Sequence, residues 1–198
     1  FRLIFDSCVK NGRRGRGPYN ALSRKPAPYQ RIRAEPQVKP EPKPAIAINE
    51  VMAVNATTIA DGTGSFLPWV ELFNFGGAPV DVGGMFLTDD VTRPRKHVVP
   101  AAVIQPGDGL VVFVPGGDPQ DASILTIRQV GVGRLYLLDK VEGGTCLIDE
   151  DFEYDFTLLG PDLSIGRSGG TWQLLAAPTP GSANDMPAAL GNASELRI

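Results

Sequence analysis

The amino-acid sequence predicts an all-β fold, an antiparallel β-sandwich or barrel. About 130 residues hold about ten short segments that are apolar or alternate between apolar and polar, with turn signals between them. Glycine (23 residues) and proline (18) are frequent without a fixed period, which favours many turns over a collagen-like chain. Because no stretch carries a 3.6-residue apolar stripe, we expect under about a tenth of helix, below the usual one-third or so.

Each strand is assigned from its own pattern. The start of the domain, IAINEV, alternates with a period of two, and 110–114 is a continuous apolar run that predicts a strand buried on both faces. In chain order, strands are expected over 46–54, 69–74, 80–87, 97–99, 110–114, 123–130, 134–139, 145–149, 152–156, 163–167 and 171–175.

The stretch 67–90, LPWVELFNFGGAPVDVGGMFLTDD, is the most apolar part of the pattern. The residues from Asn74 to Pro79 form a turn cluster, because Asn and Gly tolerate positive φ and proline fixes φ near −65°. We expect the strands on either side of this turn to form a hairpin. Trp69 is expected to anchor the hydrophobic core rather than to stack on a ligand.

The 198 residues fit one domain with extensions. Prolines recur through 34–45, which favours an extended polyproline II linker. The first residue is phenylalanine, and FRLIF alternates like a strand already under way, so we expect the chain to be a piece of a longer protein. The predicted parts are a basic extended segment (1–33), a Pro-rich linker (34–45), a β-sandwich (46–184) and a C-terminal tail (185–198).

Charge is distributed unevenly. Residues 1–45 carry eleven lysines and arginines against three acids, a net of +8, whereas residues 46–198 carry eight against nineteen, a net of −11. Such asymmetry is informative about partners. No apolar run approaches the roughly 18 residues of a membrane helix, so no membrane span is expected.

Seven short segments are spread over nearly the whole of 46–184: INEV (48–51), WVELFN (69–74), VDVGGMFLTDD (80–90), IQPG (104–107), LYLLD (135–139), SIGR (164–167) and PTPGSAN (178–184). In their order and spacing, these segments resemble the lamin tail domain of nuclear lamins, which also occurs in many bacterial secreted and surface proteins. The bacterial form is the closer likeness. Pro68 and Arg134 depart from the acidic residues that are common there.

This resemblance implies an immunoglobulin-like sandwich over 46–184. It also implies an accessory module without a catalytic motif, which binds or displays and is extracellular or on the bacterial cell surface. Residues 1–33 resemble the last strand of a preceding domain of this kind.

His97 is the single histidine of the chain. A Ser-His-Asp or Cys-His arrangement would need it, because its unperturbed pKa lies near neutrality. It follows Arg95 and Lys96 with no nucleophile beside it in sequence, so we expect a structural histidine, no enzymatic activity and no cofactor.

The acids of 149–155, DEDFEYD, form a carboxylate cluster that could attract Ca²⁺. The alternation of Glu153 and Asp155 with aromatic residues is instead typical of a solvated strand face, which we prefer, and no metal is expected. Cys8 and Cys146 could bridge, although two unpaired buried thiols are the simpler interpretation.

The basic segment could bind a polyanion, with Tyr19 and Tyr29 stacking on bases. We favour a protein contact, because the acidic domain would repel phosphate. The leading hypothesis is a non-catalytic binding or structural module that acts in adhesion or assembly, through protein partners or self-association. The alternative is a nucleic-acid-associated protein with a basic arm on a β-sandwich scaffold. The expected partner-binding residues are Arg13, Arg14, Arg16, Arg24, Lys25, Arg31 and Arg33.

Overall fold

The computed structural model describes residues 44–116, 121–129, 132–141, 144–155, 160–184 and 188. All of them belong to the second of the two units into which the chain divides, Lys43–Ile198. Every regular element in these ranges is a strand, and every strand pairing is antiparallel. The prediction of an all-β antiparallel sandwich with little helix is therefore confirmed for the described residues. The finer expectation of an immunoglobulin-like topology stays a prediction.

Most predicted strands are present with bounds close to those expected. The described elements are β1 (Ile46–Met52), β2 (Trp69–Asn74), β3 (Val80–Asp81), β4 (Phe86–Thr88), β5 (His97–Val98), β6 (Val103–Ile104), β7 (Gly109–Phe113), β8 (Val132–Val141), β9 (Gly144–Asp155), β10 (Ile165–Ser168) and β11 (Thr171–Leu174).

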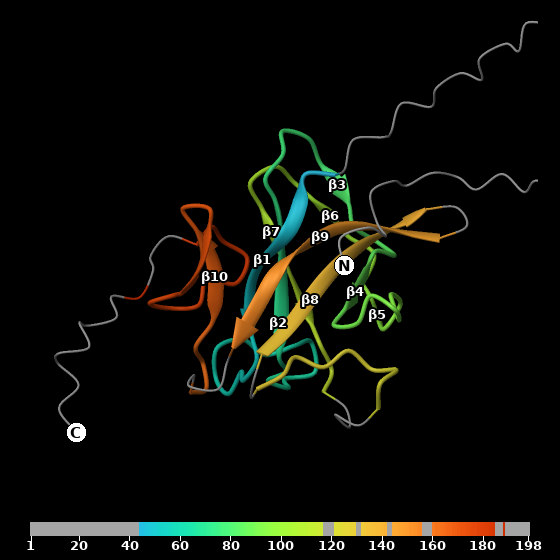
Figure 1. The fold of residues 1–198 in the computed structure, drawn as a ribbon. Helices are drawn as coiled ribbons and strands as arrows, with labels where there is room; N and C mark the ends of the chain where they lie inside the picture. The colour runs from blue at the N-terminus through green and yellow to red at the C-terminus, as the bar shows by residue number, and fades with distance from the viewer. Residues whose placement is uncertain are drawn as a thin grey trace, which may run out of the picture. The chain divides into compact units, whose positions relative to one another are not determined.

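Two main sheets make up the fold (Figure 1). One has five strands in the order β11-β10-β1-β2-β7, the other has four in the order β5-β4-β8-β9, and β3 and β6 form a separate pair. Figure 1 shows β8 and β9 crossing in front of β1 and β2. The first and last strands of the described residues, β1 and β11, thus share one sheet, because β10 pairs with both of them.

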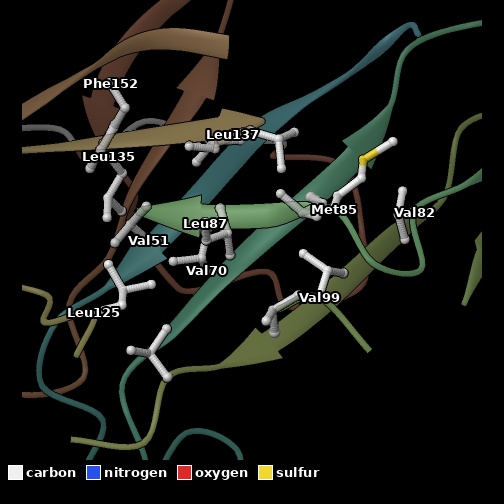
Figure 2. Packing of buried hydrophobic residues seen from close by; sticks show 14 of the residues in the cluster. Val51, Val70, Val82, Met85, Leu87, Val99, Leu125, Leu135, Leu137 and Phe152 are labelled. Atoms are coloured by element: carbon white, nitrogen blue, oxygen red, sulfur yellow. The ribbon is translucent and has the colours of Figure 1, made fainter. Parts of the chain in front are cut away.

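The apolar core fills the space between the sheets. Figure 2 shows side chains of the five-stranded sheet, such as Val51 and Val70, beside Leu87, Leu135 and Leu137 of the four-stranded sheet. Alternate residues of β1 and β2 face the other way and are buried too: Trp69 has no exposed surface. The prediction that Trp69 is a buried core residue is confirmed.

The predicted hairpin of 69–87 is wrong. β2 pairs with β1 and β7, whereas β4 pairs with β5 and β8, so the chain crosses from one sheet to the other. The side chain of Asn74 accounts for this. Its Nδ2 donates to the carbonyls of Ala78 and Ile104, and its Oδ1 accepts from the backbone of Gly76. These bonds tie the turn to the segment before β7 instead of closing a two-strand ladder.

Three further expectations need correction. The run 110–114 is not buried on both faces: Val112 and Val114 are buried, but Leu110, Val111 and Phe113 are only half-buried, because β7 is an edge strand. Residues 123–129 form no strand, although Leu125 and Ile127 are buried. The two strands expected over 145–156 are one strand, β9, whose ladder with β8 continues through register shifts near Leu137.

Candidate functional site

Two buried glutamates lie side by side on the five-stranded sheet. Glu50 of β1 is the cross-strand partner of Glu71 of β2, and neither has exposed surface. A bulge makes Asn49 the extra residue of β1, so that Asn49 and Glu50 both lie opposite Glu71. These side chains occupy the face that carries Trp69, away from the main apolar core.

The C-terminal segment, residues 178–184, supplies most of the hydrogen-bond partners of these groups. The backbone N–H and the hydroxyl of Thr179 contact the Glu50 carboxyl, and the N–H of Gly181 donates to Glu71 Oε2. Asn49 Nδ2 donates to Glu71 Oε1 at 2.7 Å. Asn184 Nδ2 donates to the carbonyls of Asn49 and Arg167, both at 2.9 Å. We call Asn49, Glu50, Glu71, Thr179, Gly181 and Asn184 the buried polar network.

Burial governs the protonation of this network. The pKa of Glu71 is raised to about 7, because desolvation and, to a smaller extent, the charge of Glu50 outweigh the hydrogen bonds from Asn49 and Gly181 that lower it. Desolvation also raises the pKa of Glu50 above its ordinary value and outweighs the hydrogen bonds it receives. The pair therefore holds protons more tightly than exposed carboxyls do.

Two glycines leave room for the network. A Cβ on Gly109 of β7 would lie 2.8 Å from the Glu71 carboxyl carbon, and a Cβ on Gly166 of β10 would lie 2.6 Å from Asn184 Nδ2 and 2.7 Å from Leu175 Cδ1. A larger residue at position 109 would displace the Glu71 carboxyl, and a larger residue at position 166 would displace Asn184 and Leu175.

Gly166→Ala is expected to lower the free energy of unfolding by about 1–3 kcal/mol, because the added methyl displaces Asn184 and Leu175. Urea unfolding of the full chain measures this. Gly62→Ala is the matched control, since its Cβ would meet nothing within 4 Å. Equal midpoints for the two variants would contradict the close approach of Asn184 to β10.

A second polar cluster joins the two sheets. Arg167 Nη2 lies 2.9 Å from Asp149 Oδ2, and Arg167 Nε donates to the carbonyl of Ile48 at 2.8 Å. Asp149 Oδ2 in turn accepts from the Ile48 N–H at 2.9 Å. The guanidinium lies 4.7 Å from the centre of the Trp172 ring. Ile48 lies beside the bulge and is not paired with β10. Its N–H is bonded to Asp149 instead, and its carbonyl is bonded to Arg167.

Most predicted site residues fall outside the part of the chain that the structure describes. The seven cations of the basic segment, together with Cys8 and the side chain of Cys146, lie outside the described residues. His97 is a half-buried residue of β5, and its buried Nε2 has no hydrogen-bond partner within the described ranges. Burial lowers the pKa of His97.

The acidic stretch 149–155 divides into different environments. Glu153 is exposed and pairs with the exposed Arg134, next to a fully buried Phe152, as a solvated strand face predicts. The expectation that Asp149 belongs to an exposed acidic surface is wrong, because it is buried against Arg167. The side chains of Glu150, Asp151 and Asp155 are not described. No three of the described histidine, cysteine and acidic side chains are grouped so as to hold a metal ion.

The sequence analysis missed the buried polar network. A signal was present in the sequence: Glu71 lies between Val70 and Leu72 in WVELFN, and Glu50 lies with Asn49 inside the otherwise apolar strand IAINEVM. A charged residue there must be buried, and a buried carboxyl needs a partner. No local pattern identifies that partner, because Thr179 follows Glu50 by 129 residues.

No family model, curated protein or solved structure matches the chain. The resemblance to lamin tail domains therefore stays a prediction. No helix in the described ranges has the length and apolar character of a membrane span.

Proposed function

We propose that the chain is a non-catalytic binding and structural module of the lamin-tail type, with immunoglobulin-like topology, from a bacterial extracellular or cell-surface protein. One observation carries this proposal. Five of the segments on which the resemblance rests meet in the folded domain through hydrogen bonds of their own residues. They are 48–51, 69–74, 104–107, 164–167 and 178–184.

These contacts support a structural role for the segments. Glu50 and Glu71 hold the C-terminal segment, and Asn74 holds the turn at Ile104. The side chains with the chemistry most expected of an enzyme are thus engaged with the chain's own backbone. The sheets end at β5, β7, β9 and β11, and edge strands of this kind present backbone groups to partner proteins.

The proposed mode of action is assembly through charge. The basic segment, with its net of +8, engages the acidic domain of a neighbouring copy, whose 46–198 region carries −11. Exposed carboxylates of the described domain include Asp81, Asp108 and Asp121. Single exposed pairs contribute only about 0–1 kcal/mol each, so several must act together, and salt must weaken them.

Sedimentation of the full chain at low and high salt tests this proposal. The parent is expected to self-associate at low salt and to dissociate as salt rises. A variant in which the seven cations Arg13, Arg14, Arg16, Arg24, Lys25, Arg31 and Arg33 are glutamine should remain monomeric. A control that replaces the exposed domain cations Arg93, Arg128 and Lys140 by glutamine should behave like the parent.

Two results would overturn the proposal. If the seven-residue variant associates as the parent does, the basic segment does not drive assembly. If the parent instead retains duplex DNA at physiological salt, with affinity falling steeply as salt rises, the segment acts on nucleic acid and the alternative function replaces this one.

A further inference from the structure

The hydrogen-bond donors and acceptors around Thr179 leave one proton to be accounted for. The Thr179 hydroxyl oxygen lies 2.8 Å from Glu50 Oε2 and 2.8 Å from Asn184 Oδ1. A hydroxyl has a single hydrogen to donate. If both neighbouring oxygens were acceptors only, one of these two short contacts would be an unfavourable oxygen–oxygen approach.

The orientation of Asn184 is fixed by its other contacts. Its Nδ2 faces the backbone carbonyls of Asn49 and Arg167, both at 2.9 Å. Carbonyl oxygens can only accept, so the amide nitrogen must face them and Oδ1 must face Thr179. The Thr179 hydroxyl hydrogen is therefore committed to Asn184 Oδ1, and the hydrogen between Thr179 and Glu50 must come from Glu50.

Glu71 has the opposite requirement. Its Oε1 faces Asn49 Nδ2 and its Oε2 faces the Gly181 N–H, and both of these nitrogens can only donate. Each oxygen of Glu71 is thus satisfied in the ionised carboxylate. The hydrogen-bond contacts of the two side chains are all satisfied when Glu50 is a neutral carboxyl and Glu71 is an ionised carboxylate.

We propose that Glu50 carries a proton and donates it to the hydroxyl of Thr179, so that a protonated carboxyl holds the C-terminal segment on the sheet and the segment loosens when this proton is lost. Loss of the proton leaves an oxygen–oxygen contact at Thr179 and places two carboxylates opposite each other on β1 and β2. The adjacent charged pair in the described structure, Arg167 and Asp149, is engaged with itself and with Ile48.

The direction of the pH effect follows from burial. The pKa values of Glu50 and Glu71 are raised above the ordinary 4.5, so the folded chain binds protons more tightly than the unfolded chain. The proton that the pair retains contributes fully to stability below about pH 4.5, and this contribution is lost as pH rises through the raised pKa values. Desolvation and the charge of Glu50 place the higher pKa, about 7, on Glu71, whereas the hydrogen-bond contacts place the retained proton on Glu50, and we follow the contacts in this assignment. The two carboxyls titrate as a coupled pair.

The test compares Glu50→Gln with Glu71→Gln in the full chain. The amide of Glu50→Gln carries hydrogens permanently, so it should keep donating to Thr179 and lose most of the pH dependence. Glu71→Gln would turn an NH₂ group toward an N–H donor and weaken the network at every pH. The readouts are the ¹³C shift of the Glu50 side-chain carboxyl across pH 4 to 9 and the hydrogen-exchange protection of the Thr179 and Gly181 amides.

In the parent, protection of these amides should fall between pH 5 and 9 by about tenfold for each unit by which the pKa of Glu50 is raised, and Glu50→Gln should stay nearly flat. His97 titrates in all variants and cancels in the comparison. The proposal is overturned if Glu50 titrates at its ordinary acidic value. It is equally overturned if Glu71→Gln is the tolerated, pH-independent variant. The carboxyl titration of the parent decides the matter even if Glu50→Gln does not fold.

Discussion

Trp69→Ala is expected to lower the free energy of unfolding by about 3–5 kcal/mol, the range for removing a large buried aromatic side chain. Trp69 has no exposed surface and lies between Met52 and Phe113 in the five-stranded sheet, so the neighbouring strands can collapse only partly into the cavity. Equilibrium unfolding in urea, with the slope compared between variants, measures the loss.

Two variants make the measurement specific. Phe66→Ala removes an aromatic residue that is 44% exposed, three positions earlier, and should change stability far less. Trp69→Phe keeps most of the apolar volume and should cost less than Trp69→Ala. A Trp69→Ala protein that melts within a degree or two of the parent would show that this face of the sheet is not a packed core.

Arg167→Met is expected to cost about 3–5 kcal/mol, because it leaves the carboxylate of Asp149 buried without its cationic partner. The side chain of Asp149 is only 8% exposed, and Arg167 also bonds the Ile48 carbonyl and lies over Trp172. Unfolding in urea at pH 7 gives the size of the effect.

The matched control is the ion pair of Arg134 and Glu153, whose side chains are 58% and 53% exposed. Arg134→Met should lower the free energy of unfolding far less than Arg167→Met does, because water screens the exposed pair. Adding Asp149→Asn to Arg167→Met should recover part of the loss, since no charge is then buried. Equal effects of Arg134→Met and Arg167→Met would mean that Asp149 is solvated in solution.

The positions of strands could be predicted from the sequence because alternation reports burial. Alternation misleads where side chains are buried but their backbone is not hydrogen-bonded in a sheet. Leu125 and Ile127 are buried as their spacing suggests, but their backbone joins no ladder. Asn74 to Pro79 contains good turn residues, and these mark a change of direction without specifying whether the next strand stays in the same sheet.

The candidate site could be predicted less well, because its partners lie far apart in the sequence. Asp149 sits in an acidic run that is typical of a solvated face. Its buried carboxylate is bonded by Arg167, 18 residues later, and by the N–H of Ile48, 101 residues earlier. Glu50 and Glu71 are exceptions within apolar strands, yet their donors come from residues 179 and 181. Side-chain periodicity is local, whereas satisfaction of a buried carboxyl depends on the whole topology.

The separation of Glu50 and Thr179 along the sequence also determines when their hydrogen bonds can form during translation. Glu50 leaves the ribosome 129 residues before the group that bonds it. At about 5–20 residues per second, β1 waits roughly 6 to 26 s for this partner. Over that interval the nascent β1 and β2 carry carboxyls that cannot be buried with their final donors. The hydrogen bonds that satisfy the carboxyls of the five-stranded sheet are therefore completed only after residues 178–184 have been synthesised, and until then these carboxyls need water or other partners.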